Sequence, residues 1–72
     1  MITVYAISNE ENEYMYDDEY SVGGFNYVKE IDYFTLLFED KEVAIRESLP
    51  GNRIVKMMFS EQEFKERGLR AI

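Results

Sequence analysis

The stretch FSEQEFKERGL, residues 59–69, contains the local signals that begin and end a helix. Ser60 and Glu63 form a capping box, in which two side chains satisfy backbone N–H groups left free at the helix start. Phe59 and Phe64 stand at the two positions of a hydrophobic staple, which fixes how the chain enters a helix. The sequence therefore predicts a helix that begins directly after Ser60.

The same stretch predicts where this helix ends. Gly68 stands where a chain adopts the left-handed conformation, and Leu69 can then contact Phe64 in a Schellman motif. A helix over residues 61–67 has about two turns and is too short to persist alone. We therefore expect it to pack on a sheet through Phe64.

The residues before this helix favour strands. ITVYAIS (2–8) is rich in β-branched residues and predicts a strand. FNYVKEIDYFTLLF (25–38) is apolar at both alternating positions in its second half, which suits a strand covered on both faces or a strand with a bulge. A helix over 31–38 is the alternative, but the aromatic residues, Ile31 and Thr35 argue against it.

A first hairpin follows if the chain turns at EDKE (39–42). This register sets Phe38 opposite Val43 and Leu36 opposite Ile45, and such apolar cross-strand pairs stabilise a sheet. We therefore predict a further strand directly after this turn.

A second hairpin can turn at either of two dipeptides in LPGNR (49–53). A loop at the Pro-Gly pair sets Ile45 against Lys56. A loop at the Gly-Asn pair (51–52) matches apolar residues with each other and adds an ion pair. Gly-Asn is also a recognised two-residue hairpin loop, so we predict the turn there.

These elements predict one α+β domain over residues 1–72. We expect a small antiparallel sheet of about four strands, with one short C-terminal helix packed on one face. An acidic, tyrosine-rich segment (9–24) is inserted between the first and second strands.

Alternation along the predicted strands sorts their residues into two faces. The first is the predicted core beneath the helix: Phe34, Leu36, Phe38, Val43, Ile45, Leu49, Ile54 and Met58. The second is too apolar for an ordinary solvent face: Tyr33, Thr35, Leu37, Ala44, Arg46, Val55, Met57 and Phe59. Either the acidic segment covers it with Tyr14, Tyr16 and Tyr20, or it meets a partner or a second copy.

Composition excludes several classes of site. The 72 residues include no cysteine and no histidine, which removes disulfides, thiolate zinc sites and the usual general base. The N-terminus lacks the features of a signal peptide, and no run approaches the roughly 20 apolar residues that span a bilayer. We expect a soluble, cytoplasmic protein that is not an enzyme and holds no cofactor.

The net charge of −7 is concentrated in one part of the chain. Residues 1–28 carry six acidic and no basic side chains, whereas residues 29–72 carry nine acidic and eight basic ones. Such a field disfavours nucleic acid and membranes as direct ligands and favours a basic partner.

The segment EENEYMYDDEYSVGG (10–24) is the candidate binding surface. In an extended chain, carboxylates two residues apart are on the order of 6–7 Å from each other, a spacing similar to that of successive phosphates. Interleaved tyrosines are favoured at interface hot spots. The candidate partner-binding residues are Glu10, Glu11, Glu13, Tyr14, Tyr16, Asp17, Asp18, Glu19 and Tyr20.

This segment does not match the EF-hand calcium loop, because the required residues do not stand at the required positions. An EF-hand frame that starts at Asp17 has Val22 where glycine is needed and Val28 where glutamate is needed. A frame that starts at Asp18 has Tyr20 in place of an oxygen ligand. We therefore predict no metal site.

In size, charge and lack of catalytic residues, the chain is similar to small inhibitors made by phages and mobile elements, including DNA-mimic and anti-CRISPR proteins. The leading hypothesis is thus an acidic inhibitor or interaction protein that occupies the basic groove of a nucleic-acid-binding protein.

Two alternatives belong to other classes. A small structural or assembly domain would form a homodimer through Leu37, Val55, Met57 and Phe59. Direct binding of nucleic acid would use Arg53, Lys56, Arg67 and Arg70, although neighbouring acids balance these cations.

Overall fold

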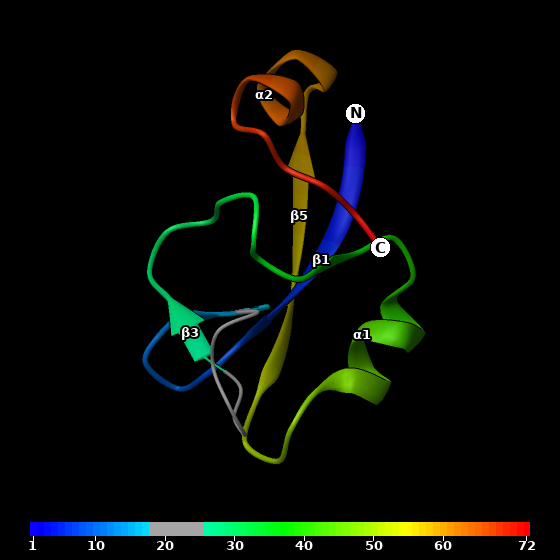
Figure 1. The fold of residues 1–72 in the computed structure, drawn as a ribbon. Coiled ribbons are helices and arrows are strands. Elements are labelled where there is room, and N and C mark those ends of the chain that lie inside the picture. The colour runs from blue at the N-terminus through cyan, green and yellow to red at the C-terminus, as the bar shows by residue number, and fades with distance from the viewer. Residues whose placement is uncertain (18–25) are drawn as a thin grey trace.

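The computed structural model describes residues 1–17 and 26–72. Its elements in chain order are β1 (Ile2–Ser8), β2 (Tyr14–Tyr16), β3 (Asn26–Val28), β4 (Leu37–Phe38), α1 (Lys41–Glu47), β5 (Arg53–Phe59) and α2 (Glu61–Glu66) (Figure 1). The α+β class and the antiparallel sheet predicted from the sequence are confirmed, and a second helix, α1, adds to them.

Strand β1 is the centre of the sheet because both of its edges are paired. Along one edge it pairs antiparallel with β5 over its whole length, from Ile2 opposite Phe59 to Ser8 opposite Arg53. Its other edge is shared between β4 and β2, with Ser8 opposite Tyr14. Strand β3 extends the sheet beyond β2. The predicted strand over residues 2–8 is therefore confirmed.

Residues 41–47 form α1 where the sequence predicted a strand, so both predicted hairpins are wrong. Asp40 explains the difference, because its side chain accepts a hydrogen bond from the backbone N–H of Glu42 and caps the helix start. Glu42 in the first turn and Arg46 in the last turn suit the helix dipole. Ala44 is the fully buried residue of this helix.

The turn at residues 49–52 therefore joins a helix to a strand. The backbone N–H of Asn52 donates to the carbonyl of Leu49 at 3.0 Å. Gly51 has a φ of 88°, a conformation that glycine adopts at little cost. The chain does turn at this glycine, but α1 precedes the turn.

The single strand predicted over residues 25–38 is two short strands, β3 and β4. Between them the backbone N–H of Thr35 donates to the carbonyl of Asp32 at 3.1 Å, which closes a turn. Thr35 also forms an isolated antiparallel bridge with Tyr16, so the chain after this turn returns to the sheet beside β2.

Helix α2 forms at the predicted place. The side chain of Ser60 accepts from the backbone N–H of Glu63 at 3.0 Å, as the capping box predicts. Gly68 has a φ of 66°, and the N–H of Leu69 donates to the carbonyl of Phe64 at 3.0 Å. This bond is the longer one of a Schellman motif.

The ring centroids of Phe59 and Phe64 lie 6.1 Å apart, so the predicted hydrophobic staple is also present.

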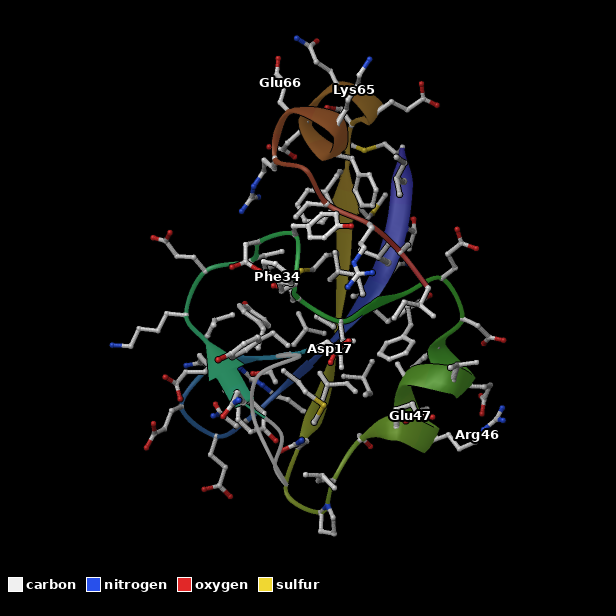
Figure 2. All side chains as sticks on the ribbon, viewed as in Figure 1. Asp17, Phe34, Arg46, Glu47, Lys65 and Glu66 are labelled. Carbon is white, nitrogen blue, oxygen red and sulfur yellow. The ribbon has the colours of Figure 1, made fainter. Side chains whose placement is uncertain are left out.

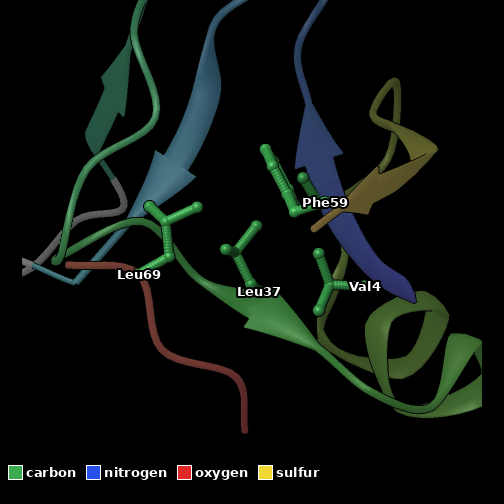
Figure 3. Packing of buried hydrophobic residues seen from close by; sticks show 5 residues of the cluster. Val4, Leu37, Phe59 and Leu69 are labelled. Atoms are coloured by element: carbon green, nitrogen blue, oxygen red, sulfur yellow. The ribbon is translucent and has the colours of Figure 1, made fainter. Parts of the chain in front are cut away.

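Two apolar clusters cover the two faces of the sheet. The first contains Val4, Ala6, Leu37, Phe59 and Leu69, and Phe64 of α2 packs against it (Figure 3). The second contains Ile7, Met15, Phe38 and Ala44. Because neighbouring residues of β1 point to opposite faces, this one strand contributes to both clusters.

The prediction of which face lies beneath the C-terminal helix is therefore wrong. Phe59 and Leu37, predicted on the opposite face, lie in the cluster that α2 joins. Four residues of the predicted core are exposed instead: Phe34, Ile45, Leu49 and Met58. Ile45 lies on α1 and Leu49 directly after it, where a strand was assumed, and Phe34 lies in the turn between β3 and β4.

Candidate functional site

The acidic hairpin, defined here as residues 9–17, is the described part of the predicted binding surface. It comprises the whole β1–β2 connection, β2 itself and Asp17. Six of the predicted residues lie in it: Glu10, Glu11, Glu13, Tyr14, Tyr16 and Asp17. The other three, Asp18, Glu19 and Tyr20, lie outside the described residues.

A neutral side chain, Asn9, organises the turn of this hairpin. Its carbonyl oxygen accepts from the backbone N–H groups of Glu11 at 3.0 Å and Glu13 at 2.9 Å. Its amide group donates to Oε1 of Glu13 at 3.0 Å. One asparagine thus fixes the backbone and also the direction of one carboxylate.

A second asparagine links the hairpin to the edge strand. Asn12 has a φ of 62°, in the left-handed region that asparagine tolerates better than most residues. The guanidinium of Arg53 donates a hydrogen bond to Oδ1 of Asn12. Arg53, a cation of β5 that reaches the acidic hairpin, is therefore hydrogen-bonded to a neutral amide.

The carboxylates of the hairpin are presented to solvent. Glu10, Glu11 and Asp17 are exposed, and Glu13 is half-buried. An extended line of carboxylates could come from Glu11 and Glu13 or from Asp17 and Glu19. Glu11 and Glu13 lie in a turn, so the first pair does not form it, and Glu19 lies outside the described residues. The chain becomes extended only at β2. Glu13 and Asp17 flank this strand, so roughly 13 Å of extended chain separates these two carboxylate residues.

The tyrosines of the hairpin anchor it to the sheet. Met15 is fully buried in the second cluster, so Tyr14 and Tyr16 point to the opposite face. Tyr14 packs against the first cluster and is half-buried. The acidic hairpin is thus part of the sheet, and of the two alternatives for the second predicted face, Tyr14 partly bears out the covering one, because it packs against the cluster that contains Leu37 and Phe59.

A hollow of about 350 Å³ lies between this turn and the turn after α1. It is open to solvent and is lined by Asn9, Glu10, Glu11, Pro50, Gly51 and Asn52. Asn52 is held in place by a 2.9 Å hydrogen bond from its amide to the hydroxyl of Tyr27.

The residues of the predicted dimer face are mostly covered within the chain. Leu37 is fully buried and Phe59 is 7% exposed, because both pack beneath the segment that contains Leu69. Val55 and Met57 are half-buried. Two of the four residues are therefore unavailable to a second copy without rearrangement, and the homodimer itself stays a prediction.

The four cations of the nucleic-acid alternative do not gather in one place. Arg53 and Lys56 are on β5, whereas Arg67 and Arg70 follow α2. Arg67 lies over the ring of Phe59 at 5.6 Å. Such a distribution lacks the continuous basic patch that a nucleic-acid strand requires.

Sequence reasoning missed one exposed aromatic pair. Tyr33 and Phe34 lie in the turn between β3 and β4, with their ring centroids 5.3 Å apart and their planes at 90°. They are 50% and 49% exposed. The spacing of Asp32 and Thr35 is typical of a turn that is capped by side chains, and it is the sequence signal that could have revealed this pair.

Within residues 1–17 and 26–72, no group of three or more acidic residues is placed to hold a metal ion. In the same part of the chain, no helix has the length and apolar character needed to cross a membrane.

No family model, curated protein or solved structure matches this chain. The chemistry of its own surface is therefore the basis on which a function is assigned.

Proposed function

We propose that this protein is a non-enzymatic interaction protein of the cytoplasm that binds a basic partner protein through its acidic hairpin. The observation that carries the proposal is the turn built on Asn9, which holds the backbone of Glu11 and Glu13 in one arrangement. A turn that is ordered before binding loses less conformational entropy when a partner docks on it.

Charge placement supports a basic partner. Residues 1–28 carry no lysine or arginine, and Glu10, Glu11 and Asp17 are exposed. The guanidinium that reaches this region, that of Arg53, is bound to the Asn12 side chain. The field of the hairpin is therefore available to steer a positively charged surface, and the association rate should fall as salt is raised.

The finer proposal is that the partner is a nucleic-acid-binding protein whose basic groove the hairpin occupies, so that the chain acts as an inhibitor. Glu13 and Asp17 lie at the two ends of β2, which gives the surface one extended stretch of fixed direction. A groove that binds phosphates accepts carboxylates for the same electrostatic reason, and the chain itself would not bind nucleic acid.

Charge reversal tests this function. We would immobilise the wild-type chain and the E10K/E11K variant, and compare the proteins that each captures from extract of the source cell. The matched control is E47K/E66K, which also raises the net charge from −7 to −3 but changes α1 and α2. Glu66 lies far from Asp17 in Figure 2, and each control position is the last residue of a helix, where a cation is tolerated.

We expect a protein that wild type and the control capture and that E10K/E11K does not. Its binding to duplex DNA or RNA should weaken when the wild-type chain is added. Equal capture by E10K/E11K would contradict the role of the hairpin, and a captured protein with no affinity for nucleic acid would contradict the finer proposal.

A further inference from the structure

The turn over residues 32–35, named here the aromatic turn, is held by its own side chains. Oδ1 of Asp32 accepts from the backbone N–H of Phe34 at 2.9 Å, and Oγ1 of Thr35 accepts from the N–H of Asp32 at 2.9 Å. Thr35 is 2% exposed, so its hydroxyl is fixed within the fold. The two residues between these caps, Tyr33 and Phe34, are half-exposed in a defined position.

Exposed aromatic rings on a rigid turn are typical of a binding surface. Large rings lose little side-chain entropy when a partner contacts them, and aromatic residues are enriched at interface hot spots. A turn built only to connect β3 to β4 needs no aromatic residue at either central position.

The aromatic turn adjoins the acidic hairpin. The backbone N–H of Asp17 donates to the carbonyl of Phe34 at 2.9 Å, and Tyr16 is paired with Thr35 (Figure 2). Glu30 and Asp32, on the same connection as the rings, are exposed carboxylates. Carboxylates from two segments thus lie near the aromatic pair, and the guanidinium group of Arg67 also reaches this connection, with a 3.4 Å hydrogen bond to the carbonyl of Ile31.

The molecule already contains one guanidinium on this turn. The guanidinium carbon of Arg70 lies 4.7 Å from the centroid of the Tyr33 ring, and its Nε donates to the carbonyl of Tyr33 at 3.1 Å. This geometry is that of a cation–π contact. The ring of Phe34 stands at right angles to that of Tyr33, and it makes no such contact within the described residues.

We propose that Phe34 is the anchoring residue of the surface that binds the basic partner, and that it receives an arginine side chain of that partner beside Asp17. This inference rests on the proposed function and names the chemistry that recognises the partner. The guanidinium would repeat, on Phe34, the contact that Arg70 makes with Tyr33. Arginine suits such a site better than lysine because its planar group stacks on a ring.

Two labelled peptides test this site, nona-arginine and nona-lysine, each with a fluorescein group. Fluorescence anisotropy at low salt would give the dissociation constant of each peptide for wild type, F34A, F34Y and E10K/E11K. The control is I45A, because Ile45 is 46% exposed, close to the value for Phe34, and lies on α1. Circular dichroism would establish that each variant is folded.

We expect wild type to bind nona-arginine more tightly than nona-lysine. F34A should weaken nona-arginine binding about two- to fivefold and remove the difference between the peptides, because an exposed cation–π contact contributes about 0.5–1 kcal/mol. F34Y should retain the preference because it keeps the ring, and I45A should match wild type.

The outcomes separate the two proposals. If neither peptide binds, or if E10K/E11K binds both as wild type does, the proposed function fails. If E10K/E11K weakens both peptides but F34A keeps the arginine preference, the function stands and this inference is overturned. Binding of a labelled 15-nucleotide oligothymidine that F34A abolishes would also overturn it, because the ring would then stack on a base.

Discussion

The acidic hairpin and the aromatic turn are capped by the same kind of side-chain hydrogen bond, but the capping residue is neutral in one and charged in the other. In each, a side-chain oxygen accepts from the backbone N–H two residues later, from Glu11 in one turn and from Phe34 in the other. The residue that accepts is neutral Asn9 in the first and charged Asp32 in the second. The neutral residue occurs where carboxylates gather, so the turn is fixed without adding to their repulsion.

A second difference lies in what each turn presents. Asn9 has an amide group that also binds Glu13, so the hairpin orients a charge. Asp32 has no donor, and the hydroxyl of Thr35 lies against its carboxylate at 3.3 Å. The turn capped by neutral Asn9 therefore presents carboxylates, whereas the turn capped by charged Asp32 presents aromatic rings. Five substitutions test this contrast.

The largest effect is expected from M15A, which affects both turns. Met15 is fully buried, and its carbonyl accepts from the N–H of Leu36 beside the aromatic turn at 3.0 Å. Truncation leaves a cavity, so the free energy of unfolding should fall by about 2–5 kcal/mol in a urea titration. The matched control is M58A, because Met58 is 54% exposed. An equal loss in both variants would show that burial of Met15 is not the cause.

T35V should act on the aromatic turn alone. Valine keeps the shape of threonine but leaves the N–H of Asp32 without its hydroxyl partner. We expect the free energy of unfolding to fall by about 1–2 kcal/mol, and nona-arginine binding to weaken with it. The comparison is S48A, which removes an exposed hydroxyl that donates to the carbonyl of Ile45. Unchanged stability in T35V would mean that water replaces the hydroxyl.

N9A should act on the acidic hairpin alone. Alanine removes the acceptor for two backbone N–H groups and the donor to Glu13, and we expect a loss of about 1 kcal/mol. Q62A is the control, since the amide of Gln62 donates to Glu66 on the exposed surface of α2. Equal stability of N9A and wild type would contradict the role of Asn9.

The smallest effect, and the sharpest contrast, is expected between N9D and D32N. Both keep the accepting oxygen, but N9D adds a carboxylate beside Glu10, Glu11 and Glu13. We expect N9D to lose about 0.5–1 kcal/mol at low salt and to recover part of it at 1 M salt, where charges are screened. D32N should stay within about 0.5 kcal/mol of wild type. A loss in N9D that does not change with salt would exclude repulsion as its cause.

The parts of the fold that the sequence predicted are those with local causes. Helix α2 was predicted at both ends because Ser60 and Gly68 act on backbone groups a few residues away. The strand ITVYAIS was predicted from its β-branched residues. The concentration of acidic residues that defines the candidate site is also evident from the sequence alone.

The parts that were missed depend on competing or distant causes. Residues 43–45 are apolar and include the β-branched Val43 and Ile45, which suits a strand, but the cap at Asp40 favours a helix. The pairing of β1 with β5 joins Ile2 to Phe59, a register that no local pattern specifies. Asn9 and Phe34 were missed because each acts through a turn whose partners are backbone groups.

The position of β1 also has a consequence for the time at which this protein can fold. Its full-length partner β5 follows it by 45 to 57 residues, as the pairs Ser8–Arg53 and Ile2–Phe59 show. At a synthesis rate of about 5–20 residues per second, this interval lasts on the order of 2–11 s. During that interval a newly made ITVYAIS strand has one unpaired edge, so a crowded cell gives neighbouring chains several seconds in which to pair with it.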